Sequence, residues 1–346
     1  MDKKILYLSK IRAISSFAII ILHTFTMYNI VYKNELSERD FYITQLVPWL
    51  MMWAVPCFLM VTGVLLLDKN KQISIKKIFS KYILRMVLVL ILFTTIFYII
   101  DKLCDQKSFE VNDILVVSKK LLSDESWAHL WYIYLLIGIY LLLPLYKVIA
   151  DHASKTILIY ICIIAFIFLS ILPFIESLND INIGLTVCIA SIFPIYLFLG
   201  YMIHNDYIKT NVIFGILLVI IGVGFIVYMS IVDFGDNEKY IDSMLGNYSF
   251  FPIVILSIGM FILIKGRNRD YDENGFYYNM WIFFDKYSFG VYLTHLIYLR
   301  ILIKVFKFNP FEFGIWMLPI IAIGVYILSL LTTMLIKFIP GLKKLI

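Results

Sequence analysis

Long apolar runs separated by short polar segments dominate this sequence. About 20 mostly apolar residues are enough to cross a bilayer as a helix, and ten runs of roughly this length follow one another along the chain. They occupy residues 11–31, 47–67, 82–100, 130–149, 156–174, 185–203, 212–232, 250–264, 281–303 and 315–338. The first run lacks the small-residue cleavage pattern of a signal peptide, so we expect it to remain a helix. The pattern predicts an all-α integral membrane protein, a bundle of about ten transmembrane helices in a single domain over residues 1–346.

Charged residues are scarce and unevenly distributed. The chain is 62% hydrophobic and 16% charged, a composition typical of membrane proteins. Basic residues collect between alternate runs, most densely at Lys69, Lys71, Lys76, Lys77 and Lys81. The positive-inside rule then predicts a multi-pass cell-membrane protein with both termini in the cytoplasm. The net charge of +6 mainly reflects this topology, and the basic inner face is expected to meet anionic lipid or an anionic cytosolic ligand.

The first apolar run carries two ionisable residues, Arg12 and His23. Eleven positions are almost three helical turns, so the two side chains are predicted to share one helix face, roughly 16 Å apart along the axis. Ionisable groups in a membrane span are costly and usually functional. The spacing therefore indicates a site. An alternative remains open, in which Arg12 snorkels to the interface and His23 bonds to a neighbouring helix.

A reaction that used both residues needs a long, thin substrate. An arginine fork binds phosphate well, and a neutral imidazole is a suitable general base near pH 7. Acyl-coenzyme A has this shape, with an anionic head at one end and a thioester at the other. No metal site is predicted, because Cys57, Cys104, Cys162 and Cys188 lack metal-ligand spacing.

Four segments together resemble the membrane acyltransferase-3 family. The first is Arg12, ten intervening residues and His23. Residues 55–63, VPCFLMVTG, are similar to the family's VPxFFxxSG segment, residues 129–134, HLWYIY, to its HLWFL segment, and residues 288–295, SFGVYLTH, to its SYGIYLxH segment. The four occur in the order expected for the family. One departure concerns the basic stretch before the third span, where the family usually has paired arginines and this chain has Lys76 and Lys77.

The resemblance implies transfer of an acyl group, acetyl or succinyl, from cytosolic acyl-coenzyme A to a surface glycan. It implies His23 as the catalytic general base and Arg12, with Arg85 and Lys81, as coenzyme-binding residues. Arg85 lies within an apolar run and needs a partner. Lys81 could equally belong to an ordinary positive-inside flank.

Acceptor binding is assigned to His129, Trp131, Tyr132 and His295 under the same resemblance. Two of them have a structural alternative. His129 lies beside Trp127 and Trp131, which are expected at the membrane interface, and a core hydrogen bond to a neighbouring helix competes with a place beside His23 as the explanation of His295. Asp285 and Arg300 flank His295, and either could be an ordinary span-end charge. Tyr132 and Tyr292 are candidates for stabilising the oxyanion. The outer loop 101–129 is expected to hold an amphipathic helix around 111–122 that covers an outer opening.

The sequence thus predicts a membrane O-acyltransferase acting on an extracytoplasmic or cell-surface glycan. Its expected partners are a surface or lipid-linked glycan acceptor, membrane lipids and glycan-assembly proteins, without nucleic acid. Two other classes remain open. One is a transporter or flippase of the glycan or its lipid-linked precursor, with the same charges lining a path. The other is a catalytically silent scaffold in a glycan-assembly complex.

Overall fold

The computed structural model describes residues 5–110, 112–123, 127–179, 181–185, 187–235, 246–266 and 275–346, and over these ranges the chain is helical with no strand. The helices fall into two compact units. The first comprises residues 1–71 and 148–288, and the second residues 72–147 and 289–346. Each unit is described by itself. The prediction of an all-α membrane protein is confirmed, whereas a single domain over 1–346 stays a prediction.

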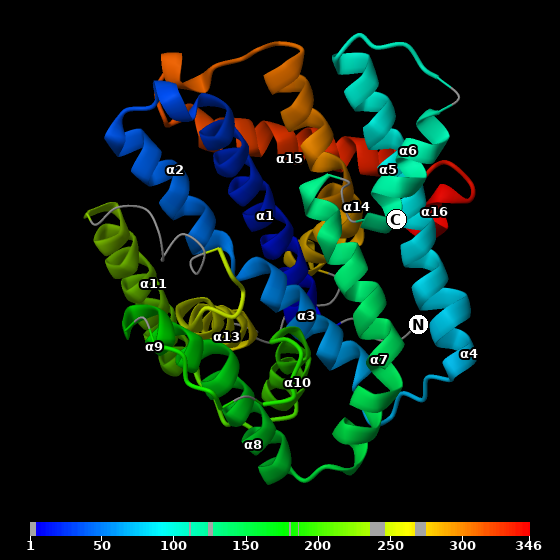
Figure 1. Ribbon diagram of the computed structural model, residues 1–346. Coiled ribbons are helices and arrows are strands. Elements are labelled where there is room, and N and C mark those ends of the chain that lie inside the picture. Colours follow the sequence, from blue (N-terminus) through cyan, green and yellow to red (C-terminus); the bar gives the residue numbers. More distant parts are fainter. Residues whose placement is uncertain are drawn as a thin grey trace. The chain divides into compact units, whose positions relative to one another are not determined.

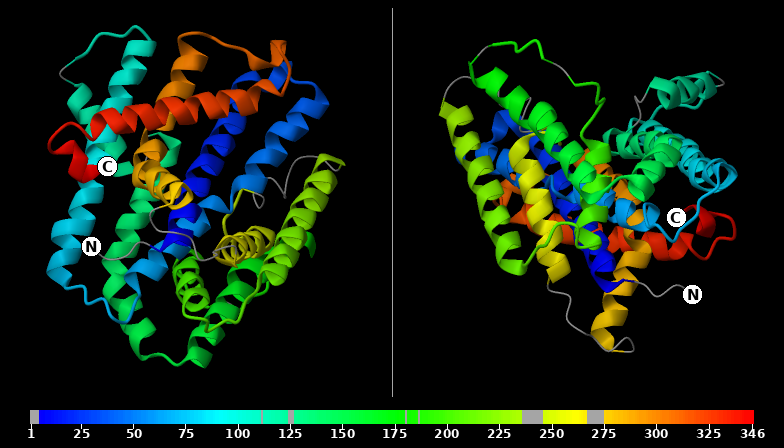
Figure 2. Two further views of the ribbon diagram at one scale, coloured as in Figure 1. Left: turned by 180° about the vertical axis from the view of Figure 1, so that it is seen from behind. Right: turned by 90° about the horizontal axis from the view of Figure 1, so that it is seen from below.

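The first unit is built around the N-terminal helix. Its helices are α1 (Leu6–Tyr32), α2 (Glu38–Met51), α3 (Ala54–Leu66), α8 (Lys155–Phe166), α9 (Leu172–Asn179), α10 (Phe193–His204), α11 (Val212–Gly235), α13 (Phe251–Gly266) and the start of α14 (Phe276–Lys304), with short turns η1 (Lys33–Glu35) and η4 (Ile167–Ile171). α1 packs against α2, α3 and α13, and α10 packs against α3. α11 and α13 lie side by side in every view (Figures 1 and 2).

Two glycines allow α3 and α10 to approach closely. A Cβ on Gly63 would collide with the backbone of Leu197, and a Cβ on Gly200 would collide with the backbone of Met60. In membranes, small residues at a helix crossing permit the backbone contact that holds helices together. Gly63 ends the segment 55–63 singled out in the sequence, so the glycine of that segment has a packing role.

The second unit combines a central helical stretch with the C-terminal helices. It contains α4 (Ile75–Lys77), η2 (Ile78–Ile83), α5 (Leu84–Cys104), α6 (Asp113–Ser123), η3 (Ala128–Leu130), most of α7 (Trp131–His152), the rest of α14, η5 (Pro310–Glu312), α15 (Met317–Ile336) and α16 (Leu342–Leu345). α6 and α16 both pack against α5. The expected amphipathic helix is confirmed as α6, although Val111, at its predicted start, lies outside the described residues.

Seven segments of the described chain are long and apolar enough to cross a membrane. They are Leu6–Glu35, Glu38–Leu66, Ile75–Cys104, Ala128–His152, Lys155–Asn179, Val212–Val232 and Met317–Ile336. Phe193–His204 and Phe251–Gly266 are shorter apolar helices. The predicted total of ten spans and the cytoplasmic placement of both termini stay predictions.

Two predicted spans differ from the structure. Residues 187–192 are not helical, and α10 begins only at Phe193, where Pro194 supplies the fixed φ that favours a first helical turn. The predicted helix 47–67 is interrupted at Met52 and Trp53, between α2 and α3. Pro56 explains this interruption between α2 and α3, because it has no N–H to donate to the Met52 carbonyl and its ring crowds that oxygen.

Candidate active site

The pair that first indicated a site lies on one uninterrupted helix. α1 runs from Leu6 to Tyr32 without a break, so its register places Arg12 and His23 on the same face, about 16 Å apart along the axis. Both residues are half-buried. The periodicity derived from the sequence therefore holds in the structure of this helix.

Arg12 is held by a buried carboxylate of α14. Its Nε lies 2.7 Å from Oδ1 of Asp285, and its Nη2 donates a hydrogen bond of 2.9 Å to Oδ2. Ser9, nearly one turn earlier on α1, donates from its hydroxyl to the same Oδ2 at 2.8 Å. The side chain of Asp285 is only 4% exposed, against 29% for Arg12. Asp285 is therefore not an ordinary span-end charge, and Arg12 does not simply snorkel.

A second cluster, in the other unit, brings two predicted acceptor residues together. The rings of His129 and His295 are 5.2 Å apart between centroids, and both side chains are almost fully buried. The rings of Tyr132 and Tyr292 lie 5.7 Å apart, and that of Tyr292 is 5.6 Å from His129. His129 thus lies in a packed aromatic cluster, and its role in acceptor binding stays a prediction.

Carbonyl contacts determine which nitrogen carries the proton in each ring of this cluster. Nε2 of His129 lies 3.3 Å from the Leu293 carbonyl oxygen, and Nδ1 of His295 lies 2.6 Å from the Tyr292 carbonyl oxygen. A carbonyl only accepts, so these nitrogens donate, and the opposite nitrogen of each neutral ring keeps its lone pair. The Tyr292 hydroxyl donates to the His129 carbonyl. The proton of the Tyr292 hydroxyl is therefore already used by this carbonyl.

The remaining predicted residues belong to the same unit. Arg85 has the partners that its apolar surroundings require, because its Nε donates to the Leu345 carbonyl at 2.9 Å and its guanidinium lies 5.3 Å from the Phe289 ring centroid. Lys81, one turn earlier, is exposed. Trp131 is half-buried, and its ring lies 6.1 Å from that of Tyr132.

Comparison with known proteins identifies the protein family. A family model described as an acyltransferase domain matches residues 5–338, nearly the whole chain. The chain belongs to the acyltransferase-3 family. It is therefore a multi-pass membrane acyltransferase that transfers groups other than aminoacyl groups. No curated protein and no solved structure matches it.

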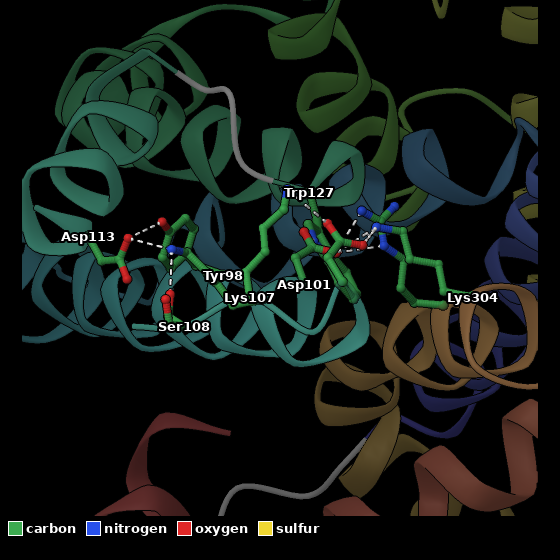
Figure 3. A network of polar contacts seen from close by, with 10 residues as sticks. Tyr98, Asp101, Lys107, Ser108, Asp113, Trp127 and Lys304 are labelled. Carbon is green, nitrogen blue, oxygen red and sulfur yellow. Dashed lines mark hydrogen bonds and ion pairs between the residues drawn. The ribbon is translucent and has the colours of Figure 1, made fainter. Parts of the chain in front are cut away.

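A charge network of the acyltransferase fixes the segment that leads into His129 (Figure 3). Trp127 donates from Nε1 to Oδ2 of Asp101 at 2.8 Å, and its ring stacks on Phe97 with 4.1 Å between centroids. Arg300 of α14 contacts Oδ1 of Asp101 through Nη2 at 2.6 Å, and its guanidinium lies 5.2 Å from the Trp127 ring. Sequence reasoning missed this network, because Trp127 was expected only to lie at the membrane interface and Arg300 had an alternative as an ordinary span-end charge.

A second part of the network holds α6 against α5 (Figure 3). Oδ1 of Asp113 accepts from the Tyr98 hydroxyl at 2.6 Å and lies 3.0 Å from Nζ of Lys102, while Oδ2 accepts from the Glu110 N–H at 2.9 Å. The hydrogen bond from Tyr98, followed by that from the Glu110 backbone, lowers the pKa of Asp113 to about 2. The carboxylate is thus charged at all physiological pH values.

Metal-binding groups and an apolar cavity would each be a further candidate site in the described part of the acyltransferase. Across the described ranges no three His, Cys, Asp or Glu side chains are grouped to hold a metal ion. A cavity of about 180 Å³ lies between α8, α10 and α13 in the first unit, lined by apolar side chains such as Cys162, Met202 and Val254. It offers nothing to bind a phosphate or activate a hydroxyl.

Proposed function

We propose that this acyltransferase moves an acetyl or succinyl group from cytosolic acyl-coenzyme A to a hydroxyl of an extracytoplasmic or cell-surface glycan. The family supports the acyl transfer. The acyl group and the glycan acceptor are what the resemblance to the family implies, and the spacing of Arg12 and His23 fits the length of acyl-coenzyme A. The observation that carries the inference is the common face of α1, where a guanidinium and an imidazole are separated by about 16 Å along the uninterrupted helix.

Arg12 is proposed to bind a coenzyme phosphate and His23 to act as general base. A guanidinium recognises phosphate with charge-assisted, directional hydrogen bonds. The pantetheine arm of the donor then extends along the helix face and brings the thioester towards His23. Arg85 and Lys81 are assigned a supporting role at the coenzyme.

The proposed reaction is a direct transfer. His23 takes the proton of the acceptor hydroxyl, and the hydroxyl oxygen attacks the thioester carbonyl carbon. A C–O ester bond forms and the C–S bond breaks, so coenzyme A leaves as a thiolate. The proton then passes from the imidazolium to the thiolate sulfur, which returns His23 to its neutral form. Backbone N–H groups, Tyr132 and Tyr292 are the candidate donors to the oxyanion.

The acceptor sugar is assigned to the histidine and aromatic cluster of the second unit. His129, Trp131, Tyr132 and His295 combine ring faces with nitrogen and hydroxyl groups, the chemistry that suits a sugar. The packed rings at His129 and His295 support a rigid platform. Membrane lipids surround the protein, and glycan-assembly proteins are its expected partners.

Thiol release tests this proposal directly. Purified protein in lipid nanodiscs is incubated with acetyl- or succinyl-coenzyme A, with and without extracted surface glycan, and free thiol is measured. We expect release that depends on the glycan. Mass spectrometry of surface glycans from cells with and without the protein should show the matching acyl group. Glycan movement across the membrane without thiol release would instead support the transporter, and unchanged glycans would support the silent scaffold.

A further inference from the structure

The strongest unassigned feature of the molecule is the environment of Asp285. Its carboxylate is buried and receives three contacts from a single helix, two from Arg12 and one from Ser9. The nearby Ser288 hydroxyl donates to the Asp285 backbone carbonyl. The carboxylate charge is thus balanced by the guanidinium on α1.

The direction of the contacts matters for the function of Arg12. A guanidinium has five donors in a planar fork, and Asp285 occupies the edge formed by Nε and Nη2. The edge formed by Nη1 and the second Nη2 proton points away from this carboxylate. Arg12 also keeps 29% of its side chain exposed. A buried acid therefore holds one edge of the fork, and the other edge does not face that acid.

We propose that Asp285 is a positioning residue that fixes Arg12, with Ser9 fixing Asp285, so that the outer edge of the guanidinium is presented to a coenzyme phosphate. This inference rests on the proposed donor-binding role of Arg12. Asp285 does not compete with the phosphate, because leaving a buried carboxylate without its counter-charge is strongly unfavourable. The three residues act as one unit, the carboxylate reducing the conformational freedom that a long arginine side chain would lose on binding.

Direct binding and kinetics together test the role. The dissociation constant for coenzyme A is measured by calorimetry on the purified full-length protein, and KM and kcat for acetyl-coenzyme A are measured by glycan-dependent thiol release. Asp285→Ala should weaken coenzyme A binding and raise KM about fivefold, while kcat stays within about twofold. Asp285→Asn, which preserves the shape and one acceptor oxygen, should cause a smaller rise of about twofold. Asparagine is nearly isosteric with aspartate, so coenzyme A binding can still be measured on Asp285→Asn if Asp285→Ala fails to fold.

A matched control and a double variant separate positioning from simple structural support. Asp206 is also paired, its Oδ1 lying 2.7 Å from Nζ of Lys265, but its side chain is 76% exposed; Asp206→Asn should leave coenzyme A binding unchanged. In an Arg12→Ala background, Asp285→Ala should have no further effect on coenzyme A binding, because Asp285 acts only through Arg12.

Each contrary result has a distinct meaning. If Arg12→Ala weakens coenzyme A binding but Asp285→Ala leaves it unchanged or strengthens it, the positioning role is overturned and the proposed function stands. If the Asp285→Ala effect is as large without Arg12 as with it, Asp285 is only a structural anchor. If Arg12→Ala itself leaves binding unchanged, the donor site on α1 is wrong, and the positioning role with it.

Discussion

The two arginines proposed to bind the coenzyme, Arg12 and Arg85, have different partners in this acyltransferase. Arg12 is paired with a carboxylate, whereas Arg85 donates to a backbone carbonyl and lies over an aromatic ring. A fork already aligned by a buried acid is suited to bind a second anion on its other edge. Among the predicted coenzyme ligands, Arg12 therefore has the better oriented donors.

His23→Ala is the sharpest test at the residue scale. If His23 is the general base, the substitution should lower glycan-dependent thiol release at least about 100-fold. The melting temperature should hardly change, because alanine is the best helix former. His152→Ala is a matched control, since His152 is exposed at the end of α7 and should retain full activity. More than about a tenth of wild-type turnover in His23→Ala would exclude the role.

At the scale of elements, two kinds of contact hold neighbouring helices together. α3 and α10 meet through Gly63 and Gly200, where no Cβ fits. α6 is instead held to α5 by charge, through Asp113, Tyr98 and Lys102. The two contacts respond to different changes, the first to side-chain volume and the second to pH.

Gly63→Ala should destabilise the protein in detergent by about 1–3 kcal/mol, because the added methyl forces the α3 and α10 backbones apart. The midpoint of thermal unfolding measures the effect. Gly224→Ala in α11 is the control: its added Cβ meets no atom within 4 Å, so the better helix propensity of alanine should leave stability equal or slightly higher. Equal melting temperatures for the two variants would contradict the close contact.

The docking of α6 should weaken only in strong acid. The folded pKa of Asp113 is about 2, below the ordinary value of about 3.9. The charged form therefore stabilises docking above about pH 4, and this contribution is lost as the pH falls to about 2. Pepsin cleavage within loop 101–129 measures docking, with Asp113→Asn as the reference because it lacks the charge at every pH. The variant should be cut faster than wild type at pH 4, and the two rates should converge near pH 2. Equal rates at pH 4 would contradict the role of Asp113.

At the scale of the whole molecule, the membrane topology decides whether the proposed donor site at Arg12 faces the cytoplasm, where acyl-coenzyme A is found. Single cysteines at Lys33 and Lys107, in a background where all four native cysteines are alanine, should react with an impermeant thiol reagent added to intact cells. A cysteine at Lys71 should react only after permeabilisation, since the positive-inside rule places that segment in the cytoplasm. If only the cysteine at position 71 reacted from outside, the topology would be the reverse of the predicted one. Arg12 would then face away from cytosolic acyl-coenzyme A, and the proposed donor site would be wrong.

The sequence alone determined features that depend on local spacing. The class of the protein follows from runs of apolar residues, since burying about 20 of them in lipid requires a helix. The shared face of Arg12 and His23 follows from helical periodicity. The four segments 12–23, 55–63, 129–134 and 288–295 indicated the family, which the match over residues 5–338 confirms.

Only the tertiary structure decided the partners of the charged and polar residues. Asp285 and Arg12 are 273 positions apart, and Arg300 and Asp101 are 199 apart, so hydropathy along the chain carries no information about either pair. The same holds for the meeting of His129 with His295 and for the backbone contact at Gly63. Periodicity is a property of neighbours in sequence, whereas pairing is a property of neighbours in space.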